Sequence, residues 1–412
     1  MRLALTLASI SLILIAGLAR AQVFTAIEMI DSPDRGLAEQ PSLVALPDGR
    51  VFLSWTELSG LVEASVLTAV FDGTTWSEPV SVAQGDDLFV NFADFPSAVA
   101  LRDGTIAVHW LRMLGASPYA YGVNIAMSQD GGATWGETIV PHRDDSPREH
   151  GFVSLLPDGP DGALVMWLDA RSYDPAQADA SDNAMQLRAT TLTAEGARAE
   201  DLMLDARTCT CCQTSAAVTQ DGTVLLAYRD RTLDEIRDIS VVRRVDGIWS
   251  EPNSVSNDGW EIAGCPVNGP AIDAQGDFAA LVWFTEADGI PAVKLAYSQD
   301  RGENFGRGHR IDLGDPSGRV DLAMLPDGTA LVSWVERTDA GEALMVCRAT
   351  QTGSCGTPEA VTVSGSGPSI GFPRMTPVGG DVYFAWTAPF RDASVGSGGG
   401  TFIGFARATL LP

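Results

Sequence analysis

The stretch "PSLVALPDGRVFLSW" (residues 41–55) decides the fold of this chain, because its pattern returns six more times. It consists of an apolar strand, an Asp-Gly turn and a second apolar strand that ends in Trp55. Asp-Gly between two strand-like runs predicts a tight hairpin, since glycine adopts the positive φ that such turns need. The other copies are "PSAVALRDGTIAVHW" (96–110), "FVSLLPDGPDGALVMW" (152–167), "TSAAVTQDGTVLLAY" (214–228), "PAIDAQGDFAALVW" (270–283), "VDLAMLPDGTALVSW" (320–334) and "PRMTPVGGDVYFAW" (373–386).

The spacing of these copies predicts a propeller. A Trp, or Tyr228 in one copy, ends each of them at intervals of 51 to 61 residues. Each interval leaves room for two further strands, as in "SVLTAVF" (65–71) and "TWSEPVSV" (75–82), which matches a four-stranded blade. The predicted fold is therefore all-β, a single β-propeller of seven four-stranded blades, with six blades as the alternative. The N-terminal "QVFTAIEMI" (22–30) is expected to supply the last strand and close the ring.

The first residues read as an export signal. Arg2 precedes a long apolar run, and Ala19-Arg20-Ala21 is a small-x-small cleavage pattern. We expect a signal peptide over 1–21, cleaved after Ala21, and one propeller domain over 22–412. No later segment is long and apolar enough to span a bilayer, so a periplasmic or secreted protein without a membrane span is expected.

The charge of the chain limits its partners. The formal net charge is −26, and loss of Arg2 and Arg20 with the signal peptide makes it more negative. Such a field repels phosphate, so nucleic acid is not an expected partner. A monomer that takes a small molecule or a glycan is expected.

Two further turns carry a family resemblance. They are "SQDGGATW" (128–135) and "SQDRGENF" (298–305), in which an Asp caps its own turn and an aromatic residue tucks back between strands. With these Asp-boxes the chain resembles the Asp-box (BNR-repeat) propellers, whose best-known members are sialidases. The resemblance covers the whole mature chain and implies a structural role for Asp130 and Asp300, on the face opposite the active site.

Chain direction assigns residues to that active face, which carries the starts of the innermost strands and the loops after each Trp. Propeller ligands bind in the central depression of such a face. The candidate ligand-binding residues there are Arg229, Arg231, Asn268, Arg319 and Arg374. The candidate acid–base residues are Glu149, His150 and Asp230.

The resemblance also implies a sialidase catalytic set, which this sequence does not match. That set comprises three arginines on the substrate carboxylate, a Tyr nucleophile paired with a Glu, and an Asp acid/base. Glu39 stands where the first arginine belongs, and Tyr297 and Tyr383 fall on an Asp-box strand and a core strand. No Tyr nucleophile is identified, so typical sialidase activity is not expected.

The six cysteines form two groups. Cys347 and Cys355 flank a turn and are expected to form a cross-hairpin disulfide. The remaining four are Cys209, Cys211, Cys212 and Cys265. An even count in an exported protein favours disulfides, including one between blades four and five, with the pairing left open. The alternative is a thiolate site for Cu or Zn formed by these four cysteines with His150.

Three functions follow from these observations. The first is an exported propeller that binds a ligand, in particular a glycan, in its central funnel, without the standard sialidase catalytic set and without a cofactor. The second is a sialidase-like glycoside hydrolase. The third is a metal-binding or redox-linked protein built on the four-cysteine cluster.

Overall fold

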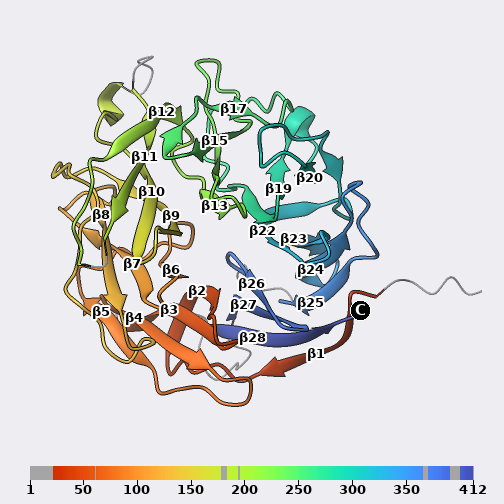
Figure 1. Cartoon of the computed structure of the whole chain (residues 1–412), viewed down its shortest axis with the longest axis horizontal. Helices are drawn as coiled ribbons and strands as arrows, with labels where there is room; N and C mark the ends of the chain where they lie inside the picture. Colours follow the sequence, from red (N-terminus) through yellow and green to blue (C-terminus); the bar gives the residue numbers. More distant parts are fainter. Residues whose placement is uncertain are drawn as a thin grey trace, which may run out of the picture.

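Seven antiparallel sheets surround one axis, each contributed by one sequence repeat (Figure 1). The computed structural model describes residues 22–60, 62–177, 183–193, 195–364, 370–389 and 400–411, so the predicted signal peptide lies outside it. The sheets confirm the seven-bladed prediction, and the six-bladed alternative is wrong. Within these described residues the helical elements are two 3-10 helices of three residues each, η1 (Pro175–Gln177) and η2 (Ala287–Gly289). Neither is a candidate for crossing a membrane.

The strands of each blade follow one another from the axis outward, and the N-terminal strand is the outermost of blade seven. They are β2 (Leu37–Ala45), β3 (Val51–Ser59), β4 (Glu63–Phe71) and β5 (Val80–Gly85) in blade one; β6 (Ser97–Ala100), β7 (Ile106–Met113) and β8 (Tyr121–Ser128) in blade two; β9 (His150–Asp158), β10 (Gly162–Asp169), β11 (Met185–Leu192) and β12 (Leu202–Thr208) in blade three; β13 (Ser215–Val218), β14 (Val224–Arg229), β15 (Ile239–Val245), β16 (Ile248–Trp249) and β17 (Asn253–Ser254) in blade four; β18 (Ala271–Gln275), β19 (Phe278–Thr285), β20 (Ala292–Ser298) and β21 (His309–Arg310) in blade five; β22 (Pro316–Met324), β23 (Ala330–Thr338), β24 (Gly341–Ala349) and β25 (Glu359–Val363) in blade six; and β26 (Arg374–Val378), β27 (Asp381–Pro389), β28 (Thr401–Leu410) and β1 (Phe24–Ile30) in blade seven.

The ring closes through its two ends, as predicted. β1 pairs antiparallel with β28, with Ile27 opposite Ala408. Blade two departs from the four-stranded prediction, since its sheet has three strands. Ile139 takes the fourth place through a single bridge to Ile125 on β8. The residues between "SQDGGATW" and Ile139 form no regular ladder with β8.

The inner hairpins form for the reason given by their sequence. Gly49 and Gly104 follow Asp in the turns of blades one and two, and they have φ of 85° and 91°. This is the left-handed region that glycine adopts without strain. Asp130 stabilises its own turn by side-chain hydrogen bonds. Its carboxylate accepts one from the N–H of Thr134 at 2.8 Å and one from the hydroxyl of Thr134 at 2.6 Å.

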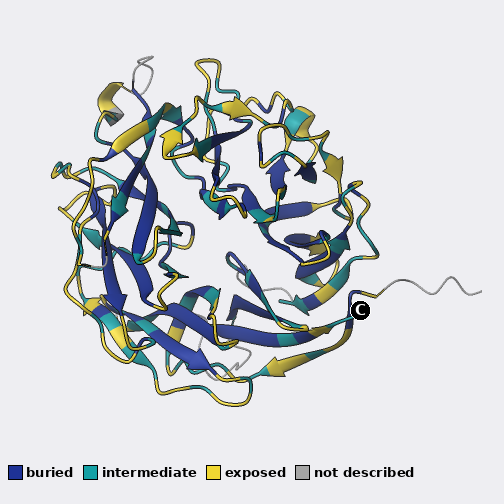
Figure 2. Ribbon diagram, in the orientation of Figure 1, coloured by how far each residue is buried: buried dark blue, intermediate teal, exposed yellow. Residues whose placement is uncertain are grey.

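The repeated Trp residues build the core between the blades. Trp55, Trp167 and Trp334 are fully buried, and Figure 2 shows the same burial along the inner strands of the whole ring. Each indole N–H donates to an acid two residues later; for Trp167 the acceptor is Asp169, at 2.8 Å. Large aromatic side chains of this kind contribute much of the apolar area that a core buries. Packing of these Trp side chains thus fixes the positions of the strands that carry them. We call the face on which the innermost strands begin the upper face.

Candidate functional site

A depression of about 460 Å³ opens on the upper face. Its walls come from the loops after β7 and β10 and from the segments that lead into β6, β9, β13 and β18. Four neighbouring blades therefore contribute to it, from blade two to blade five. Of the predicted site residues on the upper face, Glu149 lines this depression, whereas the predicted ligand-binding residues do not.

Two solvent-exposed aromatic side chains line the depression. Phe92 and Tyr119 line it and are 56% and 68% exposed. Every other aromatic side chain whose burial the structure describes is buried or half-buried. Exposed aromatic groups gathered at one concave place, with a few polar groups beside them, mark a ligand site more strongly than scattered surface apolar groups do.

Two carboxyl groups meet at one phenol in this depression. The Tyr121 hydroxyl lies 2.7 Å from Glu149 Oε1 and 3.0 Å from Asp94 Oδ2. Tyr121 begins β8, whereas Asp94 precedes β6 and Glu149 precedes β9. We call Asp94, Tyr121 and Glu149 the acid cluster. It joins blades two and three at the wall of the depression.

The geometry of the acid cluster favours a carboxyl group that carries a proton. A phenol has one proton to donate, so its second contact is a hydrogen bond only when that carboxyl carries a proton itself. Burial raises the pKa of Glu149 to about 8, and the nearby Asp94 charge adds to this rise. Burial raises the pKa of Asp94 to about 7.

The backbone around Gly151 leaves room for the Asp94 side chain in the acid cluster. A Cβ at Gly151 would lie 1.9 Å from Asp94 Oδ2, so only glycine leaves room for this carboxylate. The next residue, Phe152, has φ of 53° and donates its N–H to Asp94 Oδ1 at 2.8 Å. The Phe89 ring stacks on Tyr121 with centroids 3.8 Å apart. The three side chains are therefore held by main chain and packing on several sides.

All six cysteines are paired. The disulfides join Cys347 to Cys355, Cys211 to Cys265 and Cys209 to Cys212. The first is the predicted cross-hairpin bridge and the second is the predicted bridge between blades four and five. Cys211 and Cys265 line the depression, and Cys211 Sγ lies 3.9 Å from Cys209 Sγ.

This pairing argues against the alternative of a Cu or Zn site at the cysteines. Cys209, Cys211 and Cys212 do bring their sulfurs together, but a disulfide sulfur lacks the thiolate charge that binds soft metals. His150, the fifth predicted ligand, belongs to a separate group with Asp144 and Asp169. The proposed five-ligand set is therefore not brought together.

Arg229 is a structural residue in this fold, not the predicted ligand-binding one. Its side chain is buried, and its guanidinium donates to the carbonyl oxygens of Asn268, Arg237 and Phe284 at 2.6 to 2.8 Å. It also lies over the Trp260 ring, 4.8 Å from the centroid. Its donors are directed at main chain of blades four and five, so they are not presented to the depression.

The two neighbours of Arg229 also serve local contacts. Arg231 pairs with Glu235 at 2.6 Å. Asp230, a predicted acid–base candidate, accepts a hydrogen bond from the Ser240 hydroxyl at 3.0 Å, and burial raises its pKa. Neither residue lines the depression.

The remaining predicted ligand residues lie nearer the axis. Asn268 Oδ1 accepts the Arg319 N–H at 2.8 Å, which ties blade five to blade six. The Arg319 side chain faces Glu342 at 3.7 Å. Arg374 faces Asp321 at 3.6 Å and lines the central channel, a separate cavity of about 220 Å³. These groups are thus not gathered with the exposed aromatics.

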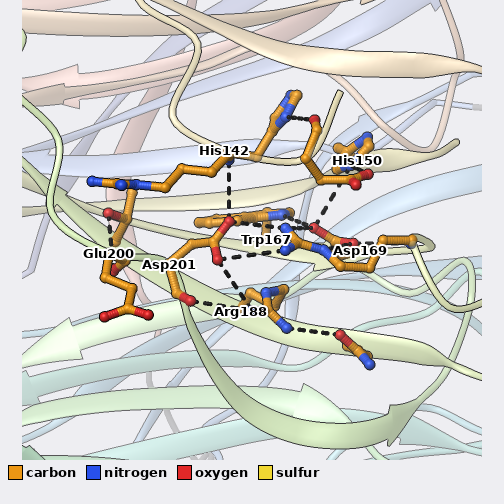
Figure 3. A network of polar contacts seen from close by, with 12 residues as sticks. His142, His150, Trp167, Asp169, Arg188, Glu200 and Asp201 are labelled. Carbon is orange, nitrogen blue, oxygen red and sulfur yellow. Dashed lines mark hydrogen bonds and ion pairs between the residues drawn. The ribbon is translucent and has the colours of Figure 1, made fainter. Parts of the chain in front are cut away.

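His150 supports the site from behind. It is fully buried, its Nε2 lies 3.1 Å from Asp144 Oδ2, and its ring stacks on His142 with centroids 4.1 Å apart. Figure 3 shows this network, in which Asp169 also takes the Trp167 N–H. Asp169 is saturated by these donors and by a 2.7 Å pair with Arg171, which leaves it a poor metal ligand. His150 holds the loop before β9 and does not reach the depression.

Sequence reasoning missed Tyr121, Phe92 and Tyr119. The repeat pattern does not pair Tyr121 with a carboxyl, whereas the structure places its hydroxyl between Glu149 and Asp94. The available signal was positional: Tyr119 and Tyr121 follow the loop after Trp110, which chain direction assigns to the upper face. Phe92 lies in the segment before β6, on that same face.

Comparisons with known proteins show the fold. No family model and no curated protein matches the chain. Among solved structures, the BP39L lectin from Burkholderia pseudomallei matches with a TM-score of 0.61 and 12% identity, over 86% of this chain and 94% of the lectin. The chain shares this propeller fold. A protein of unknown function from Dyadobacter fermentans matches at 0.53 and 15% identity, over 94% and 99% of the two chains.

An enzyme also matches. The GH93 α-L-arabinofuranosidase of Fusarium graminearum, in a complex with arabinobiose, has a TM-score of 0.50 and 12% identity, over 90% of this chain and 93% of the enzyme. Sialidase propellers match at 0.47, too weakly to support an argument. At these identities the comparisons establish a propeller of the kind shared by lectins and glycosidases, and they assign no ligand.

Proposed function

We propose that this chain is an exported protein that binds a neutral oligosaccharide in the depression lined by Phe92 and Tyr119. The observation that carries this proposal is the placement of these two exposed aromatic side chains at one concave site. The apolar C–H face of a sugar ring packs on an aromatic ring, while carboxyl and hydroxyl groups beside it accept and donate hydrogen bonds. The acid cluster supplies such groups on the wall of the same depression.

The charges favour a neutral sugar over a sialoside. Arg148 is the one basic side chain among the residues that line the depression. A sugar carboxylate calls for guanidinium groups converging on it, since charge-assisted paired hydrogen bonds supply the affinity. Arg319 and Arg374 are engaged near the axis instead, and the chain carries a formal net charge of −26. Export is supported by the three disulfides, which form in oxidising compartments.

A glycan array probed with labelled protein of residues 22–412 tests the proposal. We expect selective retention of neutral oligosaccharides. Titration calorimetry with a retained oligosaccharide then compares the double variant Phe92→Ala, Tyr119→Ala with the control Ile248→Ala, which removes a 75% exposed side chain from β16 outside the depression. The double variant should lose at least about tenfold in affinity and the control should lose none. No glycan retention, or equal affinity in the double variant, would overturn the proposal.

A further inference from the structure

We propose that the depression is also a catalytic site, in which Glu149 is the general acid for hydrolysis of a glycosidic bond. Tyr121 and Asp94 hold Glu149 in position and return a proton to it after each reaction. This inference rests on the proposed function and deepens it. Its starting point is the location of Glu149, which lines the same depression as the exposed Phe92 and Tyr119. An oligosaccharide held on those rings therefore lies next to this carboxyl group.

One oxygen of Glu149 is available to a ligand. Oε1 lies against the Tyr121 hydroxyl at 2.7 Å, and this is the one hydrogen bond of the Glu149 carboxyl group among the described residues. A carboxylic acid anchored through one oxygen presents the other with a defined direction. This is the geometry that a general acid needs, because it must reach the leaving oxygen within hydrogen-bond distance.

The surroundings of Glu149 favour its protonated form. Its facing groups in the cluster are Tyr121 and Asp94, and Arg148 precedes it in the chain and lines the same depression. A half-buried carboxyl group beside a second carboxyl group that contacts the same phenol has its pKa raised above its ordinary value. A general acid with a pKa near the working pH is efficient, since it is both protonated and able to release the proton.

The reaction balances with water as the only co-reactant. The bond between the anomeric carbon and the glycosidic oxygen breaks, and that oxygen takes the proton of Glu149. The water oxygen bonds to the anomeric carbon, and one water proton returns to the acid cluster. The cluster therefore ends each cycle with the protons with which it began. The two products are a sugar with a new reducing end at the anomeric carbon and a fragment that carries the former glycosidic oxygen as a hydroxyl.

Tyr121 and Asp94 complete the path of this returning proton. Asp94 is 2% exposed, yet it lines both the depression and the central channel, so the cluster connects two cavities. The phenol lies between the two carboxyls and can pass a proton from one to the other. Tyr121 and Asp94 are positioning residues, since Glu149 is the member that meets the substrate.

The test uses fluorescently labelled neutral oligosaccharides that the wild-type protein retains on the array. Wild type is expected to shorten them, with the products resolved by chromatography. Glu149→Gln should keep the binding affinity within about threefold and lose about a hundredfold or more in turnover. The control Glu251→Gln, an exposed carboxylate away from the depression, should match wild type. Thermal melting of each variant checks that it is folded.

The pH profile separates a catalytic cluster from a merely structural one. The Asp94 charge raises the pKa of Glu149 and the Tyr121 hydrogen bond lowers it. Asp94→Asn should therefore shift the alkaline limb of turnover to lower pH, and Tyr121→Phe should shift it to higher pH. Bound oligosaccharides that stay intact, full turnover by Glu149→Gln, or unshifted limbs would overturn the catalytic inference while binding stands. Absence of binding would instead defeat the proposed function.

Discussion

Replacing Arg229 by Met is expected to destabilise the fold without removing a ligand contact. Three main-chain carbonyls accept from this buried guanidinium, and each buried acceptor left without a donor costs about 1–3 kcal/mol. Burial lowers the pKa of Arg229 to about 9, which records the cost of desolvating its charge. Relief of that cost offsets part of the loss, so the net expectation is about 4 kcal/mol.

Equilibrium denaturation in urea measures this difference. For a domain of this length, about 4 kcal/mol corresponds to a fall of about 5 °C in the melting temperature. The control is Arg35→Met, which removes one member of an exposed pair with Glu78 and should change stability by less than about 1 kcal/mol. A stable Arg229→Met protein that has lost glycan binding would refute the structural role and restore Arg229 as a ligand-binding residue.

Three further predictions concern the depression. Folding raises the pKa of Glu149 from 4.5 to about 8, so the stability that this residue contributes is complete below pH 4.5 and is lost as the pH rises through about 8. The free energy of unfolding of Glu149→Gln should therefore decline less between pH 5 and 9 than that of the wild type. Cys211→Ser with Cys265→Ser opens a bridge with a sequence separation of 54, and denaturation should show a loss of at most about 4 kcal/mol together with weaker glycan binding by calorimetry. Gly151→Ala forces its methyl group onto Asp94, so turnover should fall while calorimetry still detects binding.

The fold could be predicted because its determinants are local and repeated. The Asp-Gly turn at Gly49, the Trp that ends each second strand, and the spare strand 22–30 are all visible within one repeat or at one end of the chain. Chain direction then assigned Glu149 to the face that carries the depression. A bridge between blades four and five followed from the same argument, since adjacent blades converge at their inner strands, whereas the choice of Cys211 and Cys265 as its partners did not.

The site could be predicted only in part, because it depends on contacts between blades. The meeting of Tyr121 with Glu149 joins two repeats and depends on side-chain direction, which periodicity does not give. Arg229 shows the opposite error: it lies at a strand end, as expected, but its side chain turns inward to carbonyls of the next blade. Position along a repeat therefore predicted which face a residue lies near, but not which cavity its side chain lines.

A crystal structure of residues 22–412 with a retained neutral oligosaccharide tests the central claim most directly. We predict a sugar ring stacked on Tyr119 or Phe92, with a glycosidic oxygen within hydrogen-bond distance of Glu149 Oε2. A sugar bound in the central channel at Arg374, or on the opposite face near the turn of Asp130, would contradict this account.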